Sequence, residues 1–224
     1  MTADAPRSIL VTGGAGFIGS HLAARLAAQG RVVTVLDDLR TGQARNVPRG
    51  VRLVEGDVTD PTAVAGLDWA SFDAVCHLAA QSSGARSFED PEADLKSHVL
   101  GTFHLLEQCR THGIPRFLYA GSTTIYGAPE RLPANEDTPP DPRSFYAAGK
   151  VAAEAYVRLH RGLGVDGTIL RMPNVYGPGQ NLANMQQGMI SIYLAYMLRG
   201  EPILVKGGLD RGRDFVCIDD VVDA

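Results

Sequence analysis

A glycine-rich stretch, VTGGAGFIGSHL at residues 11–22, constrains the fold of this 224-residue chain more than any other feature. It follows the apolar, β-branched run 8–12 and leads into a segment whose apolar residues recur at helical spacing. Glycines at three-residue steps, Gly13, Gly16 and Gly19, permit a tight turn and let backbone amides approach a phosphate closely. The positive end of the helix would then hold that phosphate. The stretch predicts a strand, a phosphate-binding loop and a helix, with a simple connecting turn as the alternative.

The same alternation of strand and helix continues along the chain. Apolar runs that end in small or polar residues occupy 32–38, 51–57, 73–80 and 116–122, and helical patterns occupy 91–112 and 146–164. Residues 166–177 are expected to add a strand and loop, 185–198 a helix and 202–205 a short strand. Such alternation predicts an α/β fold, a doubly wound parallel sheet (Rossmann) with helices on both faces. In this fold, ligands bind beyond the carboxyl ends of the strands.

Composition argues against several kinds of partner and environment. The net charge of −4 and the pI near 5.8 give no basic surface for nucleic acid. Cys76, Cys109 and Cys217 are odd in number and lie in apolar runs, which indicates reduced, buried thiols in the cytoplasm and neither a disulfide framework nor a metal site. The polar N-terminus and the lack of a run of about 18 apolar residues disfavour secretion and membrane insertion.

An acidic residue after the second predicted strand indicates which dinucleotide the loop would bind. Asp37 lies 18 residues beyond Gly19, where its carboxylate can accept both hydroxyls of an adenosine ribose and would repel a 2′-phosphate. The glycine loop contains no Arg or Lys, although Arg40 follows soon after Asp37. NAD is therefore favoured over NADP. Asp57 and Val58, after the third strand, could contact the adenine, although the stretch GDVTD at 56–60 could equally form a turn and a helix cap.

The stretch SFYAAGK, residues 144–150, places Tyr146 and Lys150 four residues apart on one helix face. The pKa of tyrosine in water is about 10, so a tyrosine that acts as a general base at neutral pH needs a positive neighbour. Lys150 could lower the pKa of Tyr146 and also reach a ribose. Taken alone, the pair is more typical of a solvated surface than of an active site. Ser122, at the end of the preceding strand, favours a nicotinamide site in which Ser122 donates a hydrogen bond and Tyr146 is the acid/base.

In combination and order, these motifs resemble the extended short-chain dehydrogenase/reductase family, specifically its NAD-dependent sugar-nucleotide epimerases and dehydratases of the UDP-glucose 4-epimerase type. The matching stretches are VTGGAGFIGSHL, LDDL, GDVTD, HLAAQ, HVLGT, GSTTIYG, YAAGK, LRMPNVYGPGQ and RDFVCIDDVVDA. The resemblance implies NAD as cofactor and a UDP- or dTDP-sugar as substrate. It also implies a homodimer whose interface is formed by helices 91–112 and 144–162.

The resemblance also implies a role for each matching residue. The residues expected to bind the cofactor pyrophosphate are Gly13, Gly16, Phe17, Ile18 and Gly19. Asp37 would bind the ribose and Asp57 and Val58 the adenine. Leu78, Ala79 and Ala80 would line the cofactor, which Tyr146 and Lys150 would also contact. The catalytic residues would be Ser122, Tyr146 and Lys150. Ser122 and Tyr146 would contact the substrate, and Asn174 and Arg213 would grip its pyrophosphate; without the resemblance, this asparagine and arginine would be interpreted as a turn residue and a solvated charge.

The residues after Ser122 narrow the expected reaction. Dehydratases and decarboxylases of the family carry acidic residues there, whereas this chain has Thr123 and Thr124. Neither threonine can serve as a carboxylate, which favours redox chemistry at a sugar carbon. We expect 4-epimerisation, in which the sugar is oxidised to a 4-keto intermediate and receives hydride on its other face. A 4-ketoreductase, or a dehydratase of the same family, is the alternative.

Three departures from the family pattern qualify this expectation. His98 stands where the family usually has Asn, either as a tolerated helix residue or as a tuned active-site group. Pro173 stands where an aromatic residue is frequent in 4-epimerases. Family members also continue well beyond RDFVCIDDVVDA, so we expect an NAD-binding domain at 1–172 and a partial, C-terminally truncated substrate lobe at 173–224. A non-catalytic NAD-binding protein is the alternative from a different functional class.

Overall fold

The computed structural model describes residues 7–224 except 186–187, 204 and 206–211. Six parallel strands form one sheet in the order β3-β2-β1-β4-β5-β6. Their bounds are β1 Ser8–Thr12, β2 Val32–Asp37, β3 Arg52–Glu55, β4 Ala74–His77, β5 Arg116–Ser122 and β6 Asp166–Met172. The order reverses between β1 and β4, because β1 pairs with both β2 and β4. This topology confirms the predicted doubly wound sheet and gives it a switch point for a ligand.

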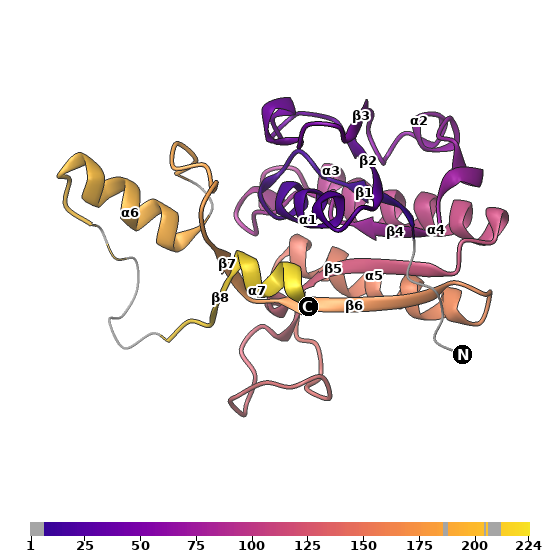
Figure 1. The fold of residues 1–224 in the computed structure, drawn as a ribbon. Helices are drawn as coiled ribbons and strands as arrows, with labels where there is room; N and C mark the ends of the chain where they lie inside the picture. Colours follow the sequence, from indigo (N-terminus) through magenta and orange to yellow (C-terminus); the bar gives the residue numbers. More distant parts are fainter. Residues whose placement is uncertain (1–6, 186–187, 204, 206–211) are drawn as a thin grey trace.

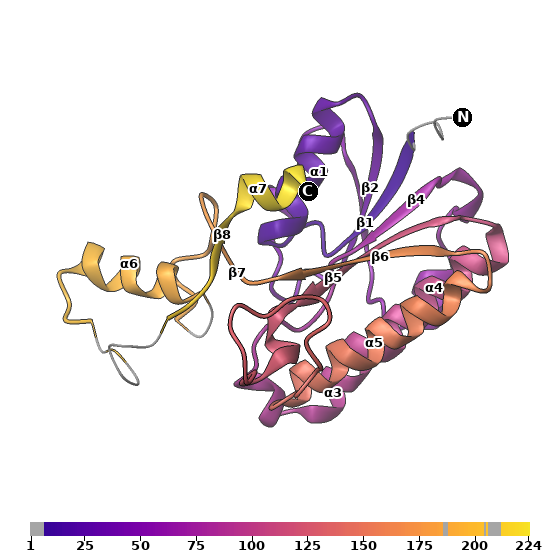
Figure 2. The same ribbon diagram turned by 90° about the horizontal axis from the view of Figure 1, so that it is seen from below.

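Helices cover both faces of the sheet (Figure 2). One face carries α3, α4 and α5, and the other carries α1 and α7. The helix bounds in the main body are α1 Phe17–Ala28, α2 Pro61–Ala65, α3 Pro91–Leu95, α4 Gly101–His112 and α5 Phe145–Arg161. Short 3₁₀ turns are η1 Ala44–Asn46, η2 Trp69–Ser71, η3 Arg86–Phe88 and η5 Thr123–Tyr126. The predicted helix at 91–112 is continuous but contains a π turn, η4 Lys96–Leu100, between α3 and α4.

Two apolar layers form the core because successive side chains of a strand point to opposite faces. Leu10 of β1 packs with Leu105 and Phe117 on the face of α4 and α5. Ile9 and Val11 pack with residues of β2 and with α1 on the other face. The sheet therefore holds its carboxyl ends, and the loops that follow them, on a rigid base.

The segment after β6 extends the molecule beyond the sheet (Figure 1). The strand expected within 166–177 is β6, and in place of the expected loop the chain forms a second short strand, β7 Asn174–Tyr176, after Pro173, which cannot donate to a ladder. The elements that follow are α6 Met189–Arg199, β8 Phe215–Cys217, which pairs in parallel with β7, and α7 Ile218–Asp223, where Asp223 forms an ion pair with Arg25 of α1.

Two expectations for the last fifty residues need correction. The helix predicted at 185–198 begins only at residue 189, with 186–187 outside the described residues. Of the strand expected at 202–205, residue 204 lies outside the described part and the other three are not in a strand.

The predictions for the cysteines and for membrane insertion can also be checked. Cys109 is buried as expected, whereas Cys76 and Cys217 are only half-buried, and all three are free thiols. Among the described residues, no helix is long and apolar enough to cross a membrane.

Candidate active site

The glycine loop joins β1 to α1 in a conformation that only glycine fits. Gly13 has φ +69°, and a Cβ there would lie 2.7 Å from the backbone nitrogen of Ala79. A Cβ on Gly19 would lie 2.2 Å from the carbonyl oxygen of Gly13. Helix α1 begins after Gly16 without a side-chain cap and without an acidic residue in its first turn. Its first backbone amides are therefore free to bind an anion, as a pyrophosphate site requires.

Asp37 ends β2 beside this loop and is buried. Its Oδ2 accepts a hydrogen bond from the Ala15 amide at 2.9 Å, and its Oδ1 accepts one from the Leu39 amide at 2.9 Å. These bonds hold the carboxylate at the mouth of the loop, where a ribose is expected. Arg40, the cation that could have welcomed a 2′-phosphate, forms ion pairs with Asp38 and Asp57. This arrangement fits NAD better than NADP.

Asp57 serves the local turn, and its predicted contact with adenine stays a prediction. Its Oδ1 accepts from the Thr59 amide at 2.8 Å, and its Oδ2 lies 2.6 Å from Arg40. Asp60, the last residue of the same stretch, caps α2, so the alternative that GDVTD at 56–60 forms a turn and a helix cap is confirmed. Val58 is buried in the core under Gly101.

A buried chain of hydrogen bonds, which the sequence did not reveal, connects the glycine loop to the π turn. Thr12 Oγ1 accepts from the Ala79 amide at 3.2 Å and lies 2.7 Å from His77 Nδ1. His77 Nε2 lies 3.1 Å from Thr102 Oγ1, which donates to the His98 carbonyl at 2.5 Å. Because Thr102 donates its only proton to His98, its oxygen must accept from His77, which therefore carries a proton on Nε2. Burial lowers the pKa of His77 to about 3, so the imidazole is neutral.

Ser122 ends β5 and caps the 3₁₀ turn η5. Its Oγ accepts from the Thr124 hydroxyl at 2.9 Å and from the Thr124 amide at 3.3 Å. Because these bonds use the lone pairs of the oxygen, the Ser122 proton is left to donate elsewhere. The sequence indicated only that Thr124 is not a carboxylate. The structure shows that Thr124 orients Ser122, the predicted hydrogen-bond donor.

Tyr146 and Lys150 lie in the first turns of α5, which begins where the Ser144 side chain accepts from the Ala147 amide at 3.1 Å. Lys150 is 4% exposed, and its Nζ donates to the Ala120 carbonyl at 2.7 Å. The same Nζ lies 5.8 Å from the centre of the Tyr146 ring. Burial lowers the pKa of Lys150 to about 8. The pair is therefore an interior feature, and the surface-pair alternative is wrong.

One expectation about this pair is not met by the structure. Burial raises the pKa of Tyr146, the Ser122 hydroxyl acts against this rise, and the charge of Asp94 adds to it. The direction of the shift is thus opposite to the lowering that was expected from Lys150. The Lys150 ammonium group donates to the backbone of β5 and lies 5.8 Å from the centre of the Tyr146 ring.

Asn174 and Arg213 come together through the pairing of β7 with β8. The Asn174 side-chain amide donates to the Asp214 carbonyl at 2.8 Å, directly after Arg213. Arg213 is exposed, and its guanidinium donates to the Gly212 carbonyl at 2.8 Å. Asn174 thus begins β7, and Arg213 lies two residues before the neighbouring strand β8, beyond the sheet. No group of His, Cys, Asp or Glu suited to hold a metal ion occurs within the described residues.

Comparison with known proteins identifies the family. The profile of the NAD dependent epimerase/dehydratase family matches residues 9–224. The chain belongs to this family. It is 39% identical to the UDP-glucose 4-epimerase of Mycolicibacterium smegmatis over 96% of this chain and 71% of that protein.

Solved structures of this family agree with the fold. The UDP-glucose 4-epimerase of Thermus thermophilus, crystallised with NAD, has a TM-score of 0.88 and 40% identity over 96% of this chain and 72% of that one. The enzyme of Thermotoga maritima, crystallised with UDP-glucose, has a TM-score of 0.92 and 36% identity over 96% and 71%. The cofactor of this epimerase/dehydratase family member is NAD, as the glycine loop and Asp37 predicted.

Proposed function

We propose that the chain is an NAD-dependent UDP-sugar 4-epimerase. The observation that carries this proposal is the convergence of Ser122, Tyr146 and Lys150 at the end of β5, on the same edge of the sheet as the glycine loop, with threonines in place of a carboxylate after Ser122. The relatives named above, with their UDP-glucose substrate, support the same reaction. The residues after Ser122 offer no acid or base for dehydration.

In the proposed reaction, Ser122 donates its free proton to the oxygen at the reacting sugar carbon, and Tyr146 takes the proton of the 4-hydroxyl. NAD⁺, when bound, would supply the hydride acceptor. Return of the proton from Tyr146 accompanies return of hydride to the other face of the keto sugar. Lys150 holds the cofactor ribose and keeps a positive charge in the site.

The glycine loop residues Gly13, Gly16 and Gly19, with Phe17 and Ile18 at the start of α1, would hold the NAD pyrophosphate. Asp37 would hold the ribose, Asp57 and Val58 the adenine, and Leu78, Ala79 and Ala80 the nicotinamide side. Residues 1–172 would then form the NAD-binding domain, and residues 173–224 would begin the substrate lobe. There Asn174 and Arg213 are proposed to bind the substrate pyrophosphate.

The test is to incubate the purified chain with UDP-glucose or UDP-galactose and to measure the 4-epimer. We expect conversion, and loss of conversion in Tyr146→Phe with bound NAD unchanged. Tyr156→Phe is the matched control, because Tyr156 lies on the same helix but is 38% exposed and distant from Ser122. Bound NAD without conversion would contradict the proposal for this chain. A keto or dehydrated product would assign the alternative chemistry.

We also propose a homodimer formed by α4 and α5. These neighbouring helices expose Phe103, Tyr156 and Leu159, and the rings of Phe103 and Tyr156 meet at 5.9 Å. A second copy that covers this face would bury the exposed apolar area. Light scattering of wild type and Phe103→Glu tests the interface. A wild-type monomer, or a dimer that survives Phe103→Glu unchanged, contradicts it.

A further inference from the structure

The π turn η4 places His98 directly against Tyr146. A π turn inserts an extra residue into a helix and often occurs at functional sites. The His98 carbonyl accepts from Thr102 at 2.5 Å, which ties the turn to the buried chain from the glycine loop. A Cβ on Gly149 would lie 3.0 Å from His98 Cβ, so α5 can approach His98 this closely only with glycine there. The His98 and Tyr146 rings meet edge to face, with centres 5.1 Å apart and planes at 84°.

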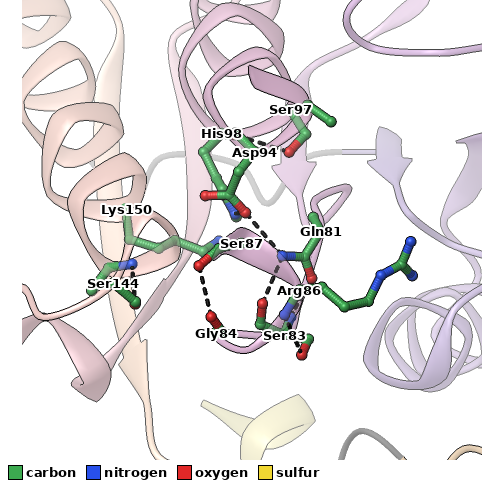
Figure 3. Close-up of polar contacts among 12 residues, drawn as sticks. Gln81, Ser83, Gly84, Arg86, Ser87, Asp94, Ser97, His98, Ser144 and Lys150 are labelled. Carbon is green, nitrogen blue, oxygen red and sulfur yellow. Dashed lines mark hydrogen bonds and ion pairs between the residues drawn. The ribbon is translucent and has the colours of Figure 1, made fainter. Parts of the chain in front are cut away.

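Asp94, one turn earlier, completes a buried polar cluster with His98 and Gln81 (Figure 3). His98 Nε2 lies 3.5 Å from Asp94 Oδ1, and the two side chains are 0% and 1% exposed. The Gln81 amide donates to Asp94 Oδ1 at 2.9 Å and to the Ser83 carbonyl at 2.7 Å. The Gln81 oxygen accepts from the Ser83 amide, which fixes the orientation of the amide group. The loop after β4 thus holds the Asp94 carboxylate in place.

Three buried atoms of this cluster lack a hydrogen-bond partner among the described residues. They are Asp94 Oδ2, His98 Nδ1 and His98 Nε2. Buried polar atoms without partners are costly, and apolar residues of similar shape would pack here at lower cost. The cluster of Gln81, Asp94 and His98 does not favour stability, and its His98 lies against Tyr146, the predicted catalytic tyrosine. The presence of these polar residues is therefore better explained by function than by stability.

The charge of Asp94 acts on both members of the predicted catalytic pair. It raises the pKa of Lys150 against the effect of burial, and it raises the pKa of Tyr146. Burial lowers the pKa of His98, which favours the neutral imidazole. The other titratable groups that act on this region are His77 of β4, Tyr119 of β5 and Glu154 of α5.

We propose that Asp94 and His98 are positioning residues of the epimerase reaction, in which the Asp94 carboxylate lies against His98 and orients its ring, and the His98 ring holds the Tyr146 ring in place. This inference rests on the proposed function. The edge of His98 would prevent Tyr146 from turning away from Ser122, and Asp94 would hold His98 in that orientation. Gln81 would support both residues by holding Asp94.

The first experiment measures the ionisation of Tyr146 without turnover. Carbon NMR of ring-labelled tyrosine, assigned with Tyr146→Phe, gives the midpoint pH in wild type, Asp94→Asn and Glu92→Gln. Asp94→Asn keeps the shape of the side chain and should lower the Tyr146 midpoint by at least about half a pH unit, because a nearby negative charge is removed. Glu92→Gln removes an exposed charge from the same helix and should leave the midpoint unchanged. An unchanged midpoint in Asp94→Asn would overturn the role of Asp94, whether or not the chain epimerises sugars.

The second experiment measures the effect of His98 on turnover. His98→Asn introduces the residue usual for the family at this position and should fold. We expect kcat to fall about tenfold to a hundredfold with KM and bound NAD unchanged, since the ring that holds Tyr146 is lost. His112→Asn, at the exposed end of the same helix, is the control. A kcat equal to wild type in His98→Asn, or an equal loss in both variants, would refute positioning by His98. Wild-type protein without activity would instead count against the proposed function.

Discussion

Replacement of Lys150 by Met should make the protein more stable at neutral pH while it abolishes activity. Lys150 is buried, and burial lowers its pKa from 10.5 to about 8. At 1.36 kcal/mol per pKa unit, this fall corresponds to roughly 3 kcal/mol of destabilisation whenever the folded lysine is ionised. Methionine would lose the hydrogen bond to Ala120, which offsets about 1 kcal/mol. The expected net gain at pH 7 is therefore about 2 kcal/mol.

The pH dependence of this gain follows from the sign of the shift. Between pH 8 and 10.5 the unfolded chain binds more protons than the folded chain at Lys150, so wild-type stability rises with pH in this window. The Met variant lacks this rise. The difference in free energy of unfolding between Lys150→Met and wild type should therefore be constant below pH 8 and smaller by about 1 kcal/mol at about pH 9.

Urea unfolding of nucleotide-free protein at both pH values is the assay. Lys96→Met is the control, because Lys96 is exposed in a pair with Glu92 and such pairs contribute little. A Lys150→Met variant that is less stable than wild type at pH 7, or whose advantage does not change with pH, would refute the reasoning from burial.

Three further predictions concern the loop, the core and Ser122. Gly19→Ala should abolish the copurification of NAD, because the alanine Cβ would lie 2.2 Å from a carbonyl oxygen of the glycine loop. NAD is detected by absorbance after denaturation, and retained NAD would contradict the predicted role of the glycine loop. Glu154→Ala should cost about 3–5 kcal/mol in urea unfolding because it leaves the largely buried Arg171 unpaired, and a loss below about 1 kcal/mol would refute this. Thr124→Val should lower kcat with little effect on bound NAD, because Ser122 would lose the donor that orients it, whereas an unchanged kcat would show that this bond is not needed.

Much of the fold followed from local patterns in the sequence. The apolar runs and their endings predicted all six strands of the sheet, because a strand covered on both faces must be apolar along its length. The spacing of Gly13, Gly16 and Gly19 predicted the loop, since its backbone conformation is set within a few residues. The helix at 91–112 was predicted without its π turn, which depends on the approach of α5 at Gly149.

The sequence by itself therefore determined which elements form and which residues carry chemistry, because those signals are local spacings of residue types. Only the tertiary structure decided how these residues act on one another. It directed the Lys150 ammonium to the backbone of β5, and it buried Tyr146 so that the pKa of the tyrosine is raised. It also brought His98 against the tyrosine, with Asp94 against His98 and Gln81 against Asp94. Burial and charge proximity arise from contacts between distant segments, which no spacing along the chain specifies.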